Sequence, residues 1–352
     1  MPHTTSASQV PVTVLTGYLG AGKTTLLNRI LSEDHGKKYA VIVNEFGEIG
    51  IDNDLVVGSD EEVFEMNNGC ICCTVRGDLV RIIGGLMKRK ERFDAILVET
   101  TGLADPAPVA QTFFADEDVA EKTRLDAVVT VADAKHLALR LDDSREAKEQ
   151  IAFADVILLN KTDLVTAAEL SQVESRIRSI NPYAKVIRTN KCAVDSKEIL
   201  DRGAFSLDRI LTLEPDFLTH DYADEHDHDH DHDHHDHHHE QEHHNHHHGK
   251  RHDDEIGSLS LREDRPLDPD KFGEWIRTTL ADQGAKILRS KGILQFRGEA
   301  QRYVLQAVHM MMDGGFTAVW GENEPRYSRF VFIGRDLDHD KLRAGFASCV
   351  AD

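Results

Sequence analysis

The sequence lacks any apolar run long enough to cross a membrane. A membrane-spanning helix needs roughly 18 or more consecutive apolar residues, and no window of the 352-residue chain approaches that length. The segment Met1–Gln9 is polar and lacks the charged-then-apolar order of a secretory signal. We therefore expect a cytoplasmic protein with no membrane partner.

Positive charge is also scarce. The chain has 41 Lys and Arg against 62 Asp and Glu, a formal net charge of −21 at pH 7. Proteins bind nucleic acid largely by neutralising phosphates with Lys and Arg, so a nucleic-acid partner is not expected. The acidic excess is uneven, because Asp224–Glu255 holds twelve acidic residues against only Lys250 and Arg251.

Cysteines are few and unevenly placed. The five are Cys70, Cys72, Cys73, Cys192 and Cys349. An odd number, with three crowded into four positions, is not typical of a secreted disulfide framework. In a reducing compartment, clustered thiols more often serve metal binding or redox chemistry. The isolated Cys192 and Cys349 are expected to be core residues.

Short apolar runs alternate with longer amphipathic stretches through residues 10–215. We expect strands at Val12–Leu15, Tyr39–Val43, Ala95–Val98, Ala127–Val131, Val156–Leu159 and Lys185–Ile187, and helices at Lys23–Ser32, Asp78–Lys90, Pro108–Phe114 and Ala167–Ile180. Apolar strands separated by helices favour a parallel sheet covered on both faces. Residues 10–215 are therefore predicted to form a doubly wound, mostly parallel α/β domain.

The rest of the chain divides into a linker and a second domain. Residues 221–254 alternate Asp and His with almost no apolar residue, so we expect a disordered linker that cannot offset its own ordering entropy. Residues 256–352 are predicted to form a small α+β domain, an antiparallel sheet with helices on one face. Its expected elements are strands at Ser258–Leu261, Ile287–Phe296, Tyr303–Met310, Thr317–Trp320 and Arg329–Ile333, and helices at Asp268–Leu280, capped by Asp268, and Asp338–Ala347.

A glycine-rich motif follows the first apolar run. Gly17-Tyr18-Leu19-Gly20-Ala21-Gly22-Lys23-Thr24 has the spacing of a P-loop between an expected strand and an expected helix, which disfavours a chance glycine-rich turn. Backbone N–H groups can close around phosphates there, while Lys23 supplies charge and the Thr24 hydroxyl ligates Mg²⁺. We expect a P-loop NTPase whose catalytic residues include Lys23 and Thr24. The phosphate site is expected to comprise Gly17, Gly20, Ala21, Gly22, Lys23, Thr24 and Thr25.

A second motif predicts the base. Asn160-Lys161-Thr162-Asp163 follows the apolar run Val156–Leu159. An Asp in this place accepts hydrogen bonds from the ring N1–H and the exocyclic amine of guanine, whereas adenine offers neither donor there. We therefore expect GTP, bound by Asp163 and braced by Asn160 and Lys161, with Thr189 completing the base pocket. The alternative is a polar turn that caps a strand.

Two further segments are expected to sense the γ-phosphate. Glu99 ends the run Ala95–Val98, the place where P-loop proteins commonly hold the Mg²⁺ shell or its water, so we assign it to catalysis. Gly102, three residues on, can bring a backbone N–H to the γ-phosphate.

The loop Asn44–Asp52 packs three acids among glycines. We interpret it as a switch loop with Asp52 or Glu45 near Mg²⁺ and Glu48 as a hard metal ligand. An ordinary solvated loop is the alternative.

Three thiols share one tight loop. Cys70, Cys72 and Cys73 lie between Asn and Gly on one side and Thr74 on the other. Thiolates are soft ligands that suit Zn²⁺ or Cu(I), and three of them leave one coordination position for Glu48, a His, water or a client group. Such an open site can release its ion. Redox chemistry is the alternative, although the adjacent Cys72 and Cys73 would form a strained disulfide.

Sixteen of the 21 histidines lie between His220 and His252, interleaved with Asp. Neutral imidazoles bind borderline metals, and neighbouring carboxylates raise their basicity. We favour a low-affinity, multi-site metal collector over a purification tag, because the tract is internal and mixed with acids. A solvated spacer is the other alternative.

Taken together, these motifs identify a family. The chain resembles the CobW family of metallochaperone GTPases, which are related to the urease and hydrogenase nickel-insertion GTPases. The resemblance spans nearly the whole chain. It includes the segments described above and two C-terminal ones, Arg289-Ser290-Lys291-Gly292 and Arg329–Asp336.

The resemblance implies GTP-dependent metal transfer. The GTP-bound protein is expected to hold the ion through Cys70, Cys72 and Cys73, and hydrolysis to release it to a client metalloprotein. GTP and GDP, Mg²⁺ and the client are the implied partners, and a homodimer is compatible with the sequence. Zinc is preferred over cobalt because thiolates with many imidazoles suit it and because it is the commonest metal of the family.

Two alternatives stay open, a cobalt factor in cobalamin synthesis and a metal buffer in which the GTPase is incidental. The zinc members that activate methionine aminopeptidase carry a Cys- and Pro-containing docking motif before the P-loop. Ser6–Val12 contains no cysteine, which speaks against that client.

Deleting Asp224–Asp253 is expected to lower the number of metal ions bound per chain while GTP hydrolysis stays at the wild-type rate. The reason is that the deletion removes imidazoles but no residue of the nucleotide motifs. Metal content after dialysis and phosphate release measure the two properties. Equal metal content in the shortened and full chains would contradict the collector role.

Overall fold

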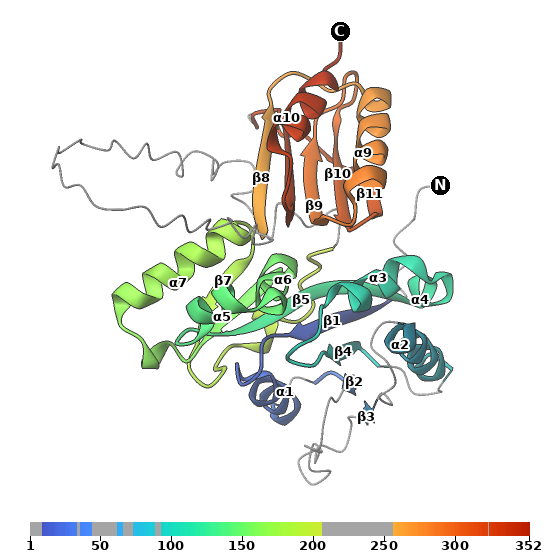
Figure 1. The fold of residues 1–352 in the computed structure, drawn as a ribbon. Helices are drawn as coiled ribbons and strands as arrows, with labels where there is room; N and C mark the ends of the chain where they lie inside the picture. The colour runs from blue at the N-terminus through green and yellow to red at the C-terminus, as the bar shows by residue number, and fades with distance from the viewer. Residues whose placement is uncertain are drawn as a thin grey trace, which may run out of the picture.

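Two β-sheets organise the chain (Figure 1). The structure, a computed structural model, describes residues 9–33, 36–43, 62–65, 73–88, 93–205, 256–322 and 324–352. Within these residues, one sheet has seven strands in the order β3-β2-β4-β1-β5-β6-β7, and every pairing is parallel. The other has five strands in the order β11-β10-β9-β12-β8, and every pairing is antiparallel.

The strands of the parallel sheet are short and mostly apolar. They are β1 (Val10–Thr16), β2 (Tyr39–Val43), β3 (Glu62–Glu65), β4 (Ala95–Glu99), β5 (Thr123–Asp133), β6 (Val156–Asn160) and β7 (Lys185–Arg188). Every residue of β2 and β6 is buried, whichever face its side chain takes. This is typical of strands covered on both sides and confirms the doubly wound α/β fold.

Helices cover the two faces of the parallel sheet. They are α1 (Lys23–Ser32), α2 (Cys73–Leu86), α3 (Ala107–Ala115), α4 (Glu117–Lys122), α5 (Leu137–Asp143), α6 (Arg145–Phe153) and α7 (Ala167–Ile180), with 3₁₀ turns η1 (Thr162–Leu164) and η2 (Ser196–Glu198). Apolar side chains of α2 to α7 form one core with one face of the sheet. Leu26, Leu27 and Ile30 of α1 pack with Ile199 and Leu200 on the other face.

The C-terminal sheet has helices on one face, as expected. Its elements are β8 (Ile256–Glu263), α9 (Pro269–Gln283), β9 (Ile287–Leu294), β10 (Gln301–Val308), β11 (Met311–Val319), β12 (Ser328–Arg335) and α10 (His339–Ser348). The Asp268 side chain caps α9 by accepting from the backbone N–H groups of Asp270 and Lys271. Phe272 of α9 and Phe346 of α10 pack around Phe330 of the sheet.

Some boundaries differ from the sequence expectations. Helix α2 runs Cys73–Leu86 instead of Asp78–Lys90, so Cys73 begins a helix and is not a loop residue. Strand β11 starts at Met311, six residues before the expected Thr317. The reason lies in the preceding turn, where His309 has a φ of 51° and allows β10 to reverse directly into a glycine-containing strand.

Strand β3, which pairs with β2, and the helices α5 and α6 were not predicted. Within the described ranges, no helix combines the length and apolarity that crossing a bilayer requires.

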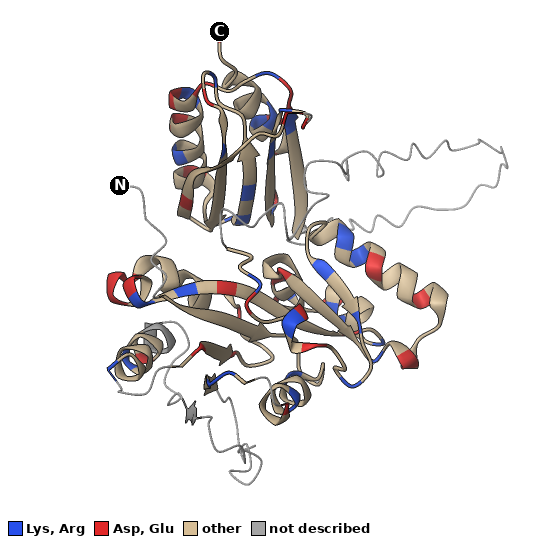
Figure 2. Ribbon diagram, turned by 180° about the vertical axis from the view of Figure 1, so that it is seen from behind, with Lys and Arg blue, Asp and Glu red and all other residues tan. Residues whose placement is uncertain are grey.

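The second face of the C-terminal sheet packs against the parallel-sheet domain through buried charges. Figure 2 shows Lys and Arg on the strands of the C-terminal sheet. The guanidinium of Arg289, on β9, donates to the Phe153 carbonyl at 2.9 Å and to the carboxylate of Asp155. That carboxylate also accepts from the Val128 N–H at 2.8 Å. Arg289 and Asp155 expose only 8% and 3% of their side chains, so the ion pair offsets the cost of removing each charge from water.

Replacing Arg289 with Met is expected to lower the free energy of unfolding by about 3–5 kcal/mol, because it leaves the Asp155 carboxylate buried without its cation. Chemical denaturation measures the change. The matched control is Arg297→Met, whose ion pair with Asp268 exposes 53% of the arginine side chain; a loss below about 1 kcal/mol is expected there. Equal losses in both variants would contradict the importance of this junction.

Candidate functional site

The turn from β1 into α1 can be built only with glycine at two of its positions. Gly17 has a φ of 143°, and a Cβ there would lie 2.2 Å from the Val131 carbonyl oxygen. Gly22 has a φ of 118°, and its Cβ would lie 2.7 Å from Nδ2 of Asn160. Any side chain would force these segments apart. The motif glycines therefore let the turn approach β5 and β6 closely.

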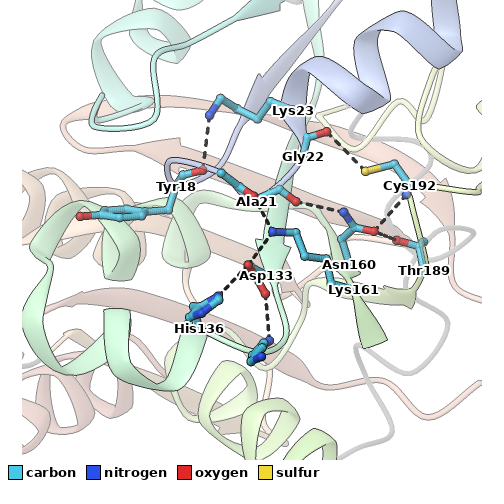
Figure 3. A network of polar contacts seen from close by, with 12 residues as sticks. Tyr18, Ala21, Gly22, Lys23, Asp133, His136, Asn160, Lys161, Thr189 and Cys192 are labelled. Carbon is cyan, nitrogen blue, oxygen red and sulfur yellow. Dashed lines mark hydrogen bonds and ion pairs between the residues drawn. The ribbon is translucent and has the colours of Figure 1, made fainter. Parts of the chain in front are cut away.

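Lys23 reaches back over this turn (Figure 3). Its Nζ donates to the Gly17 carbonyl at 2.7 Å and lies 3.5 Å from that of Tyr18. Burial lowers the pKa of Lys23, and the nearby Glu99 opposes the shift. Thr24 and Thr25 are exposed in the first turn of α1. The ammonium, the threonine hydroxyls and the start of the helix thus lie together, as phosphate binding requires.

Glu99 lies beside the end of β1. It is the last residue of β4 and pairs in register with Leu15. The N–H of the next residue, Thr100, donates to the Leu15 carbonyl, and its hydroxyl donates to the Thr16 hydroxyl, both at 2.9 Å. Carboxylate and hydroxyl oxygens are hard ligands, so the pair of Glu99 and Thr24 fits Mg²⁺.

The loop after β4 touches the phosphate turn. A Cβ on Gly102 would lie 2.8 Å from the backbone nitrogen of Leu19 and 2.6 Å from its Cδ2. Gly102 itself is buried, while Leu103 is exposed. This contact places the candidate γ-phosphate sensor directly against the P-loop.

The Asn160 carboxamide connects three segments (Figure 3). Its Nδ2 donates to the Ala21 carbonyl at 3.0 Å. Its Oδ1 accepts from the Thr189 hydroxyl at 3.1 Å and from the Cys192 N–H at 2.9 Å. Asn160 is buried, so every one of these bonds forms away from water. The expected base-site residues Asn160 and Thr189 are therefore brought together with the P-loop.

Lys161 ties the same motif to the P-loop by a second route. Its Nζ donates to the Gly20 carbonyl at 2.7 Å and to the Asp133 carboxylate at 2.8 Å. His136 Nδ1 lies 2.9 Å from that carboxylate. Burial raises the pKa of Asp133, but the hydrogen bonds from Lys161 and His136 outweigh it, and the pKa lies below its ordinary value.

Asp163, the expected guanine reader, is exposed in η1. The neighbouring Thr162 donates to the Thr189 carbonyl through its hydroxyl at 3.1 Å and its N–H at 3.3 Å. The segment carrying Asp163 and the segment carrying Thr189 are thus adjacent, and the Asp163 carboxylate is open to a ligand.

Sequence reasoning did not connect two residues to this network. Cys192 is a buried core residue, as expected, but its Sγ also lies 3.4 Å from the Gly22 carbonyl, and burial raises its pKa to about 11. Asp133 was missed although the sequence carried a signal, because it follows an apolar run just as Glu99 does. Cys349 is buried in the C-terminal domain, as expected.

Thr24 is the predicted metal ligand described above, whereas the predicted thiol ligands and the Asn44–Asp52 loop are not among the described side chains. Cys70, Cys72, Glu48 and Asp52 lie outside the described residues, as does the side chain of Cys73. The histidine tract lies outside them too. Across the described parts of the chain, no group of three or more His, Cys, Asp or Glu is placed to hold a metal ion. The thiol site remains a prediction.

Two family descriptions match the chain. Residues 11–188 match the CobW/HypB/UreG nucleotide-binding domain, and residues 256–350 match the cobalamin synthesis protein cobW C-terminal domain. The chain belongs to the CobW/HypB/UreG family. This confirms the resemblance inferred from the motifs.

Individual relatives of the family cover almost the entire chain. The zinc chaperone YjiA of Escherichia coli is 33% identical over 343 residues, 96% of this chain and 98% of the relative. The zinc chaperone CobW of Sinorhizobium sp. is 31% identical over 373 residues, 97% of this chain and 98% of the relative. The crystal structure of Zn(II)-bound YjiA GTPase from E. coli matches with a TM-score of 0.73 at 30% identity, covering 97% of this chain and 99% of that one.

Replacing Lys23 with Ala is expected to leave the chain folded and to reduce GTP hydrolysis by about 100-fold or more, because it removes the half-buried cation of the phosphate turn. Phosphate release and the far-UV circular dichroism spectrum are the measurements. Lys135→Ala, on the nearby β5–α5 turn, is the control and is expected to hydrolyse GTP normally. Wild-type turnover in Lys23→Ala would rule out the phosphate site.

Proposed function

We propose that this protein is a GTP-hydrolysing metallochaperone that binds zinc and delivers it to a client metalloprotein. The observation that carries the proposal is the likeness, over nearly the whole chain, to the E. coli protein named a zinc chaperone and GTPase. The nucleotide network supports it, because P-loop and base-site residues from distant parts of the chain meet at one edge of the sheet.

Guanine selection is proposed to depend on Asp163. Its exposed carboxylate accepts from the two donors of the guanine edge, while Lys161 and Asn160 hold the loop against the P-loop. Thr189 supplies the other wall of the pocket through its bond to Asn160. Hydrolysis of a nucleotide with adenine is disfavoured because that base presents no matching donors.

The phosphates are proposed to bind the backbone N–H groups of residues 17–25 and the Lys23 ammonium. Lys23 exchanges its bonds to the Gly17 and Tyr18 carbonyls for phosphate oxygens when GTP enters. Thr24 and Glu99 hold Mg²⁺, which when bound neutralises charge on the transferring phosphate. Gly102 offers its backbone N–H to the γ-phosphate from its position against the P-loop.

Zinc is proposed as the substrate of the Cys70, Cys72 and Cys73 thiolates, with the fourth position taken by Glu48, a His, water or a client group. Coupling to GTP has a route in the fold, since Cys73 begins α2 and α2 packs against α3. Helix α3 follows the Gly102 loop directly. A 100-fold tighter zinc complex in the GTP state needs about 2.7 kcal/mol of coupling, an ordinary amount.

Zinc affinity is expected to be about 100-fold higher with a non-hydrolysable GTP analogue than with GDP. A competing chromophoric chelator measures both values in the full chain. Replacing Cys70, Cys72 and Cys73 with Ser should abolish the nucleotide-dependent difference, whereas Cys349→Ser, which changes a buried thiol elsewhere, should leave it intact.

Equal zinc affinity in the two nucleotide states would point to a metal buffer and overturn the transfer role. A parallel titration with Co²⁺ tests the cobalt alternative, with the preference expected for zinc.

A further inference from the structure

Helix α6 lies between the Gly102 loop and the C-terminal sheet. One side-chain hydrogen bond joins its backbone to the parallel sheet, from the Thr130 hydroxyl of β5 to the Gln150 carbonyl at 2.8 Å. Adjacent side chains of the helix, Glu149 and Gln150, reach the two regions on either side of it. Both are buried and polar, which needs a specific reason in a helix interior.

Gln150 binds the Gly102 loop with both donors of its amide. Nε2 donates to the Gly102 carbonyl at 3.1 Å and to the Ala104 carbonyl at 3.2 Å. A glycine has wide backbone freedom, so anchoring its carbonyl restricts the direction of the loop. Because Gly102 also lies against Leu19 of the P-loop, Gln150 holds a segment that is in direct contact with the phosphate turn.

Glu149 faces the C-terminal sheet. Its carboxylate forms ion pairs with Arg145 of the same helix at 2.7 Å and with Arg335 at the end of β12. Arg335 exposes 13% of its side chain, and Asp105 of the Gly102 loop region contributes to the field at its guanidinium. Arg335 therefore contacts α6 directly, and the charge of Asp105 acts on it from the segment that follows Gly102.

We propose that Gln150 is a positioning residue for GTP hydrolysis and that Glu149 and Arg335 make the C-terminal sheet respond to the Gly102 loop. The proposal rests on the proposed GTPase function. When the loop turns toward the γ-phosphate, the two carbonyls pull on one amide, and α6 transmits the displacement to β12. Conversely, removing Arg335 loosens the helix that holds the loop.

The test compares kcat and KM for GTP in four variants of the full chain. Gln150→Met preserves length but removes the donor, and kcat is expected to fall about 10-fold with KM changed by less than about 2-fold. Arg335→Met leaves Glu149 paired with Arg145, and kcat is expected to fall about 3-fold. In the double variant, kcat should equal that of Gln150→Met, because Arg335 is proposed to act on the Gly102 loop only through Gln150.

The control is Arg265→Met, which removes an ion pair between the exposed Arg265 and Glu263. Glu263 ends β8, whereas Arg335 is paired with Ile256 at the start of that strand, so this variant should keep wild-type kcat. Multiplicative losses in the double variant, wild-type kcat in Arg335→Met, or a rise in KM alone would each overturn the proposal. Far-UV circular dichroism and melting temperature report whether each variant is folded.

Amide hydrogen exchange separates this proposal from the GTPase function itself. In the wild type, protection of α6 and β12 is expected to differ between a GTP analogue and GDP, and in Arg335→Met the difference in β12 is expected to vanish. Unchanged β12 protection in the wild type would overturn the link even if GTP is hydrolysed. Absent hydrolysis with a nucleotide-dependent change in β12 would instead contradict only the proposed enzymatic function.

Discussion

A single buried carboxamide holds the nucleotide site together. Asn160 supplies one donor bond to the P-loop and accepts two bonds from the segment after β7. Removing it would leave a carbonyl, a hydroxyl and an N–H buried without partners, each a loss of about 1–3 kcal/mol. The close approach also explains Gly22, because a side chain there would collide with this carboxamide. The phosphate and base subsites are thereby held at a constant separation.

The parallel sheet explains why residues far apart in the sequence meet at the nucleotide site. The P-loop, Glu99, Asp133 and Asn160 all follow or end strands, and parallel strands place such ends along one edge. The C-terminal sheet meets the same domain at a different place, on the helices and on the Arg289 and Asp155 pair. Helix α6 belongs to both regions, which is why nucleotide chemistry and the second domain share a structural element.

The sequence was sufficient for the fold class, the P-loop and the approximate position of most strands. Unbroken apolar runs and spaced glycines report local constraints that hardly depend on the partner segments. Asp133 and Cys192 could not be given their roles this way, since their contacts with Lys161 and Gly22 depend on how distant strands align. The start of β11 was missed for a related reason. Its glycines favour a loop by propensity, but pairing with β10 overrides that preference.

The thiol of Cys192 could compete with the intended ligands for a metal ion that binds sulfur. Its sulfur lies 3.4 Å from the Gly22 carbonyl of the phosphate turn and is enclosed by Gly22 and Asn160. Because burial raises its pKa to about 11, the thiol stays protonated at neutral pH. A protonated, enclosed sulfur does not compete for metal, since the thiolate is the ligand form. A soft donor can therefore be buried next to the phosphate turn without diverting the ion on its way to another protein.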